Sequence, residues 1–100
     1  MNIKISPFAE QDLERSIKWY NSEKDELGNE FAKEISHIFE RIRTNSLQFP
    51  KEYRKMQKAK TKKFPFNVFF VVKEKSVYIL GIFHSSRNPN IMKSQYKNTK

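Results

Sequence analysis

The sequence contains no cysteine, which excludes disulfide bonds and thiolate metal sites and is compatible with a reducing compartment. It also lacks any apolar run long enough for a signal peptide or a membrane span. No internal repeat and no low-complexity tract is present. These absences predict a cytoplasmic protein without membrane contact, and a length of 100 residues predicts one domain.

Acidic residues are scarce in the second half of the chain, which gives the net charge of +9 an uneven distribution. Residues 1–50 carry seven Lys/Arg against nine Asp/Glu, a balance of −2, and residues 51–100 carry thirteen against two, a balance of +11. A basic surface of this kind favours an acidic or phosphate-rich partner through electrostatic steering and counterion release. The alternative is a charge that serves only solubility.

Two apolar runs form the predicted centre of the fold. Residues 67–72 and 77–83 are rich in β-branched and aromatic side chains, and the polar residues 73–76 between them fit a hairpin turn. Both runs are nearly continuous in apolar residues rather than alternating, which predicts strands covered on both faces, with helices on one side.

Before this hairpin, the pattern predicts a short strand and two helices. Residues 2–6 alternate in polarity, and Ser6-Pro7 supplies a helix cap followed by proline in the first turn. Apolar residues at helical spacing then form one stripe in each helix, the first ending near Asn21 and the second near Thr44. The stripes are Ala9, Leu13, Ile17 and Tyr20, and then Leu27, Phe31, Ile35, Ile38 and Ile42. The short link predicts an antiparallel helix hairpin lying on the sheet.

The basic segment 51–63 predicts one strand over about 53–58, followed by a flexible loop at 59–63. The predicted fold class is therefore α+β, with a short N-terminal strand, an antiparallel helix hairpin and a three-stranded antiparallel meander. The meander completes a four-stranded sheet with the helices packed on one face. We expect a single domain over residues 1–96, with Ile91, Met92 and Tyr96 as possible anchors, and a disordered tail at 97–100.

Three motifs in this order resemble the RelE/ParE superfamily of bacterial type II toxins over about residues 3–89. They are D-L-x-x-S-I-x-W-Y at 12–20, G-x-E-F at 28–31 leading to Q-F-P at 48–50, and residues 64–89, which contain F-P-F and H-x-x-R-N-P. The third motif is the most specific. Two positions depart from the pattern, since Phe66 stands where many relatives have tyrosine and Met92 lies near where many have tryptophan.

The resemblance implies a cytoplasmic growth inhibitor that is neutralised by a cognate antitoxin and contacts DNA only indirectly, through that antitoxin. Plasmid stabilization is the associated process. ParE-like members inhibit DNA gyrase and have no known reaction of their own, whereas RelE-like members are metal-independent endoribonucleases that cleave mRNA on the ribosome. The F-P-F and H-x-x-R-N-P motifs favour the ParE-like branch. A RelE-like interferase and an inactive antitoxin-binding relative are the alternatives, and no cofactor is expected in any case.

Candidate functional residues gather where the antiparallel pairing brings two chain segments to one edge of the sheet. For a RelE-like enzyme, Arg54, His84 and Arg87 are the candidate catalytic residues, with His84 as base or acid and the two arginines as a phosphate clamp. The structural alternative is favoured: His84 bonds a backbone carbonyl and Arg87 pairs with a carboxylate.

A second predicted set is basic and is expected to bind the target or a nucleic acid, although a solvated charged loop would explain each lysine equally well. Its members are Arg54, Lys55, Lys58, Lys60, Lys62, Lys63 and Arg87.

Other polar and aromatic residues have simpler explanations. No metal site is predicted, because His37 has Arg41 rather than a ligand one helical turn later. Asp12 and Glu34 are interpreted as solvated residues on the helix surface. Trp19, with its neighbour Tyr20, is interpreted as an aromatic residue that packs against the helices or the core.

Overall fold

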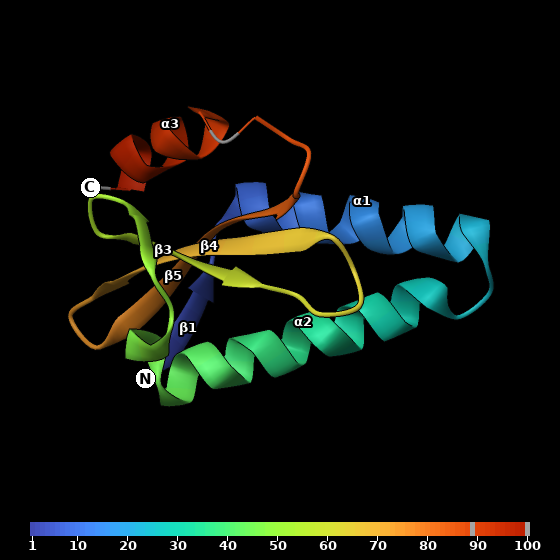
Figure 1. Cartoon of the computed structure of the whole chain (residues 1–100), viewed down its shortest axis with the longest axis horizontal. Coiled ribbons are helices and arrows are strands. Elements are labelled where there is room, and N and C mark those ends of the chain that lie inside the picture. Colours follow the sequence, from blue (N-terminus) through green and yellow to red (C-terminus); the bar gives the residue numbers. More distant parts are fainter. Residues whose placement is uncertain (89, 100) are drawn as a thin grey trace.

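The computed structural model describes residues 1–88 and 90–99 and shows a mixed sheet with helices on both of its faces (Figure 1). The elements, in chain order, are β1 Asn2–Ile5, α1 Pro7–Glu23, α2 Leu27–Thr44, the 3-10 turn η1 Ser46–Gln48, β2 Lys51–Tyr53, β3 Met56–Lys60, β4 Phe66–Lys73, β5 Ser76–His84 and α3 Asn90–Thr99. No helix in this part of the chain is long and apolar enough to cross a lipid bilayer.

The five strands have the spatial order β1-β5-β4-β3-β2, with β1 parallel to β5 and every other pair antiparallel. The α+β class and the central hairpin are confirmed, but the sheet has five strands instead of the expected four. The extra strand arises because the basic segment turns back at Arg54, whose φ of 53° is left-handed. Turns between strands are usually recognised in a sequence by glycine, proline or asparagine, and this turn consists of arginine and lysine, so it was not predicted. β3 also continues to Lys60, where a loop was expected.

A helix cap at Ser6 and a close contact at Gly28 shape the helix hairpin. The Ser6 hydroxyl accepts a hydrogen bond of 3.0 Å from the Ala9 amide, and Pro7 occupies the first turn of α1. At the far end, the Gly28 amide donates to the Asn21 side chain at 2.7 Å. A Cβ at Gly28 would lie 2.2 Å from the Ile17 carbonyl oxygen, so only glycine permits this close approach of α2 to α1.

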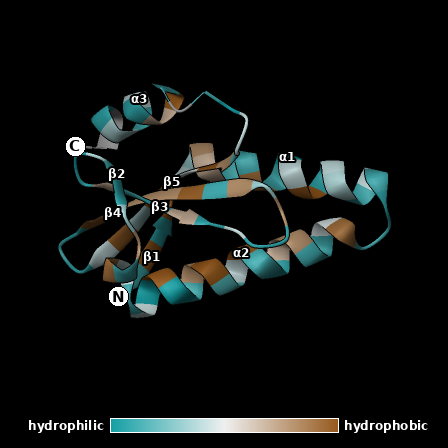
Figure 2. Cartoon of the chain, viewed as in Figure 1, coloured by the Kyte–Doolittle hydropathy of each residue, from teal (hydrophilic) through white to brown (hydrophobic). Residues whose placement is uncertain are grey.

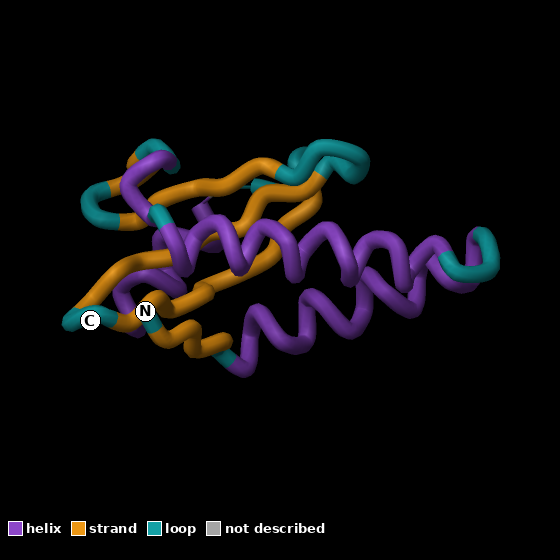
Figure 3. The backbone as a smooth tube through the Cα atoms, turned by 90° about the horizontal axis from the view of Figure 1, so that it is seen from below, coloured by secondary structure: helices purple, strands orange, loops and turns teal. Residues whose placement is uncertain are grey.

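Helices α1 and α2 cover one face of the sheet, and their apolar sides meet the strands (Figure 2). The two helices lie side by side and project beyond the strands toward the link that joins them (Figure 3). The core on this face is fully buried at its centre, and includes Ala9, Phe31, Ile35, Ile38, Ile42, Val68, Phe70, Val77, Ile79 and Ile82.

The opposite face is covered by α3, which the sequence did not predict as a helix. Met92 and Tyr96 are buried against this face, as expected for anchors, whereas Ile91 is 37% exposed. A Cβ at Gly81 would lie 2.6 Å from the Met92 sulfur, so the glycine leaves room for α3 to dock. Helix α3 includes residues 97–99 of the expected tail, and Lys100 lies outside the described residues. The domain limits of 1–96 stay a prediction.

Candidate functional site

The site forms around the exit turn, which we define as residues 84–87 directly after β5. Register pairs Phe66 with His84, and the Ser85 amide donates to the Pro65 carbonyl at 2.7 Å. The exit turn therefore lies at the same edge of the sheet as the end of the basic segment. This juxtaposition was predicted from the hairpin.

Arg87 is held in place by one carboxylate and two aromatic rings. Its guanidinium donates to Asp12 Oδ1 at 3.2 Å, and its Cζ atom lies 4.1 Å from the ring centre of Phe83 and 5.8 Å from that of Phe8. Carboxylate pairing and aromatic stacking both restrict the orientation of a guanidinium. Arg87 is thus anchored to α1, and its carboxylate pairing is the structural alternative that the sequence favoured.

Asp12 is the residue that the sequence interpretation placed wrongly. It was expected in solvent, but it is only 4% exposed, and its Oδ1 atom also accepts a hydrogen bond from Arg15 at 2.9 Å. Its other oxygen, Oδ2, has no hydrogen-bond partner among the described residues. The signal that could have revealed it is its spacing, because Asp12 lies three residues after Ala9 at the edge of the apolar stripe.

His84 is exposed, and its ring is fixed by its own turn. The Nδ1 atom accepts a hydrogen bond of 3.1 Å from the Ser86 amide and lies 2.7 Å from the Ser86 hydroxyl, which assigns the proton of the neutral ring to Nε2. The ring also packs edge-on against Phe66, with centres 5.4 Å apart. The expected bond to a backbone carbonyl is replaced by these contacts within the turn.

A cleft of about 350 Å³ opens beside the exit turn, on the face of the sheet that carries α3, and we call it the sheet cleft. It brings together Lys58, His84 and Arg87 of the predicted residues, and adds Lys93, which the sequence did not single out. Lys58 pairs with Glu52 at 3.1 Å, so part of the positive charge in the cleft is balanced. The remaining lining residues are Glu52, Tyr53, Met56, Asn67, Phe69, Phe83 and Ser85.

Tyr53 connects this cleft to Arg54. Hydrogen bonding to the Arg54 guanidinium, together with its charge, lowers the pKa of the Tyr53 hydroxyl. Lys93 Nζ lies 5.0 Å from the centre of the same ring, and Tyr96 packs edge-on against it at 5.6 Å. The β2–β3 turn and α3 are therefore joined by an aromatic pair with cations on its rim.

The other predicted basic residues do not join this cleft. Arg54 and Lys55 lie in the β2–β3 turn. Lys60 lies at the opposite end of β3 from this turn, and its side chain is exposed. Lys62 and Lys63 line a different cavity, beside α2. The seven residues are therefore distributed over four places, and their predicted binding role stays a prediction.

A third cavity, of about 670 Å³, lies on the α1 side of the exit turn and includes Trp19, Tyr20 and His84. Tyr20 packs against Phe31 and Phe64, as predicted, and burial raises the pKa of its hydroxyl. Trp19 is 58% exposed, so its assignment as a packing residue was wrong. The residues of α1 that pack with the core under the helix hairpin are Ala9, Leu13, Ile17 and Tyr20, and Trp19 is not among them.

Within residues 1–88 and 90–99, no three His, Cys, Asp or Glu side chains gather in a way that would hold a metal ion. The sheet cleft offers cationic side chains, the imidazole of His84, the phenol of Tyr53 and the carboxylate of Glu52, and the buried carboxylate of Asp12 pairs with Arg87.

Comparison with protein-family models gives one match, to the ParE toxin of the type II toxin-antitoxin system parDE, over residues 3–89. The chain belongs to this ParE toxin family. It is therefore a ParE-like toxin of a type II toxin-antitoxin system, and its membership implies a cognate antitoxin as partner. The match ends before α3, which begins at Asn90.

A solved structure supports the fold of this ParE-family toxin. A chain described as the chromosomal ParDE toxin-antitoxin system from P. aeruginosa superimposes with a TM-score of 0.75 at 23% sequence identity. The alignment covers 84% of this chain and 95% of that one. A search of curated proteins gives no significant match.

Proposed function

We propose that this toxin inhibits DNA gyrase by binding it through the exit turn and the sheet cleft. The proposal places the protein in the cytoplasm and requires no reaction of its own. A positively charged cleft with an apolar floor has the features of a protein-binding surface, namely an apolar centre and a charged rim.

One observation carries the preference for binding over catalysis: Arg87 is fixed by Asp12 and Phe83 rather than directed freely into the cleft. A phosphate clamp needs guanidinium N–H groups directed at the phosphate, whereas Arg87 already donates to Asp12 and lies over the Phe83 ring. His84 likewise uses Nδ1 within its own turn. Both residues therefore favour a rigid recognition surface.

Supercoiling of a relaxed plasmid by purified gyrase tests this proposal directly. The wild-type toxin is expected to block the reaction, and Lys93→Glu, at the rim of the cleft, is expected to require about fivefold more toxin for half-inhibition. The matched control is Lys75→Glu, an equal charge reversal in the β4–β5 turn, which should leave inhibition unchanged. Undiminished supercoiling at saturating toxin would refute the proposal, and a strain that grows normally while expressing the toxin would indicate an inactive relative.

The second candidate, a RelE-like mRNA interferase, is favoured by the lowered pKa of Tyr53, which lines the same cleft as His84 and Arg87. A phenol that ionises more readily is a better general base. This candidate predicts cuts within translated codons, and a large loss of cutting in Arg54→Ala and Arg87→Ala but not in Lys55→Ala. Intact transcripts during toxin-induced growth arrest would exclude it.

A further inference from the structure

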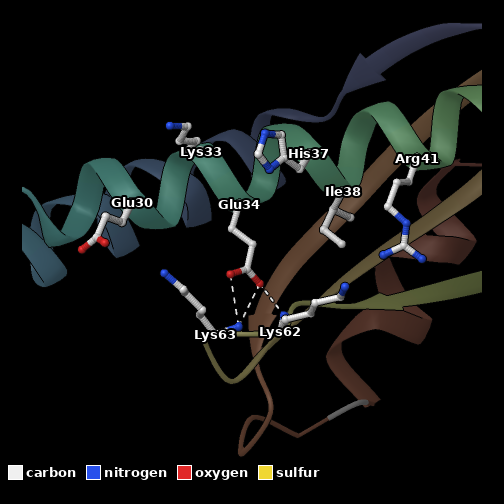
Figure 4. Close-up of a pocket in the computed structure, with 8 residues that line it drawn as sticks. All are labelled: Glu30, Lys33, Glu34, His37, Ile38, Arg41, Lys62 and Lys63. Atoms are coloured by element: carbon white, nitrogen blue, oxygen red, sulfur yellow. Dashed lines mark hydrogen bonds between the residues drawn. The ribbon is translucent and has the colours of Figure 1, made fainter.

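A separate cavity of about 520 Å³ lies between α2 and the loop that joins β3 to β4 (Figure 4), and it shares no lining residue with the sheet cleft. We call it the α2 groove. Its only apolar residue is Ile38, which is 3% exposed and forms the floor. All other lining residues are ionisable: Glu30, Lys33, Glu34, His37, Arg41, Lys62 and Lys63.

Basic residues reach the groove from two elements. Lys33, His37 and Arg41 recur at every fourth position of α2, which places them in one row about 6 Å apart. Lys62 and Lys63 come from the loop, and their side chains extend to either side of the Glu34 carboxylate, with Arg41 facing Lys62 (Figure 4). Within the described part of the chain, Lys33, Lys62 and Lys63 make no ion pair through their ammonium groups.

Glu34 and Gln48 hold this arrangement in place. The Glu34 carboxylate accepts hydrogen bonds from the backbone amides of Lys62 and Lys63, the latter at 3.1 and 3.2 Å, so the loop is fixed to α2 through its main chain. Arg41 donates to the Gln48 side chain at 2.9 Å and lies 5.2 Å from the centre of the Phe49 ring. The Arg41 guanidinium and the backbone of the loop are thus preorganised, while the side chains of Lys62 and Lys63 stay available to a ligand.

We propose that the α2 groove binds the phosphodiester backbone of duplex DNA. A peptide partner would need an apolar pocket for its anchor residues, and the one apolar residue here is already buried. A single strand would need an exposed aromatic platform for its bases, and the groove offers no phenylalanine, tyrosine or tryptophan. The groove has four cations, Lys33, Arg41, Lys62 and Lys63, against two carboxylates, Glu30 and Glu34. This excess of positive charge suits the closely spaced phosphates of a duplex.

This direct contact goes beyond gyrase inhibition and differs from the expectation that DNA is reached only through the antitoxin. The α2 groove and the sheet cleft have different lining residues, so DNA binding and gyrase inhibition can be tested and refuted independently. A DNA-binding assay without gyrase tests the groove alone.

The experiment measures the fluorescence anisotropy of a labelled duplex of about 20 base pairs over a range of salt concentrations. The wild-type protein is expected to bind with a strong salt dependence. The double variant Lys62→Glu/Lys63→Glu should bind at least about tenfold more weakly, with a salt slope smaller by about two, one unit for each lost phosphate contact. The control Lys73→Glu/Lys75→Glu makes the same charge change at the end of β4 and in the β4–β5 turn, and it should keep the wild-type slope.

Glu34→Gln provides a change in the opposite direction. The amide oxygen still accepts a hydrogen bond from the loop while one negative charge leaves the groove, so we expect DNA affinity to rise about threefold. Circular dichroism and the urea midpoint establish that each variant is folded.

Three results would overturn the proposal: no binding by the folded wild-type protein, equal loss of slope in both double variants, or an unchanged slope in Lys62→Glu/Lys63→Glu. Polyglutamate and single-stranded RNA are tested in parallel. If either polymer binds more tightly than the duplex, and its binding is lost in Lys62→Glu/Lys63→Glu, the ligand belongs to that class and the assignment to DNA is wrong.

Discussion

The buried carboxylate of Asp12 accepts a hydrogen bond of 3.2 Å from the guanidinium of Arg87, 75 residues further along the chain. The same oxygen accepts from Arg15 in the next turn of α1, so one carboxylate balances two cations. This contact connects the first helix to the exit turn, and it fixes the position of the Arg87 guanidinium in the candidate site.

Asp12→Ala is expected to lower the free energy of unfolding by about 1–2 kcal/mol, because a charge-assisted hydrogen bond is lost. The loss stays moderate since Arg87 is 37% exposed and can bind water instead. Urea unfolding measures it, with the exposed carboxylate variant Glu14→Ala as control. In a double-mutant cycle, Asp12→Ala and Arg87→Ala should couple by about 1 kcal/mol, and strict additivity would contradict a direct link.

Gly28→Ala should destabilise the fold by about 3 kcal/mol, because the new methyl group would overlap the backbone carbonyl of Ile17, which has no room to move. The urea midpoint reports the loss. Asn29→Ala, at the next position on the exposed side of α2, is the control and should change stability by less than about 0.5 kcal/mol. A Gly28→Ala protein as stable as wild type would show that the two helices are less tightly packed than described.

Gly81→Ala acts on α3 alone. Its methyl group would meet the flexible end of Met92, so the cost is smaller, about 1–2 kcal/mol, and is confined to the docking of that helix. Hydrogen exchange should accelerate at residues 91–99 while the amides of α1 and α2 stay protected. Uniform acceleration over all three helices would indicate that α3 is part of the main cooperative unit.

Tyr53 and Tyr20 should ionise in a defined order as pH rises. Bonding to Arg54 lowers the pKa of Tyr53 below the ordinary phenol value of 10.0, and burial raises that of Tyr20 above it. Tyr53 therefore ionises before Tyr20, as followed by NMR of the labelled phenol carbons. Arg54→Ala should move the Tyr53 titration upward, whereas Lys55→Ala, in the same turn, should not. If Tyr53 is unaffected by Arg54→Ala, the two groups do not interact.

The β4–β5 turn holds Glu74 and Lys75 at φ of 51° and 66°, a left-handed conformation that ordinary side chains adopt at a cost. Replacing the pair by Asn-Gly is expected to stabilise the protein by about 1 kcal/mol, because these residues suit a two-residue hairpin turn. Glu74→Ala/Lys75→Ala is the control: it removes the same two charges but keeps the conformational cost. Thermal unfolding measures both, and equal gains would assign the effect to charge.

Much of this architecture is readable from the sequence because local signals agree with the tertiary structure. Ser6 and Pro7 begin a helix, and a four-residue polar break separates two β-rich runs. The stripes of both helices pack against the core as predicted. The turn at Arg54 and helix α3 carry no such signal. The turn uses a left-handed arginine, and α3 has only two anchors, Met92 and Tyr96, that depend on an apolar surface built by distant strands.

The candidate site was predictable only in part. The pairing of His84 with Phe66 follows from the hairpin, so the edge of the sheet was correctly located. The partners of Arg87 were not, because Asp12 reaches it across the fold and resembles an ordinary helix-surface acid in the sequence. Lys62 and Lys63 were grouped with the site because they precede the first strand of the hairpin, whereas the loop directs them toward α2.

The parallel pairing of β1 with β5 affects how the toxin folds during its synthesis. Asn2 lies opposite Ser76, so the first strand has no neighbour until nearly four-fifths of the chain has left the ribosome. The helix hairpin, whose contacts are local, is able to form earlier, but its apolar side stays uncovered until the late strands arrive. A nascent chain that stops before Ser76 therefore lacks both the strand that pairs with β1 and the exit turn of the candidate site.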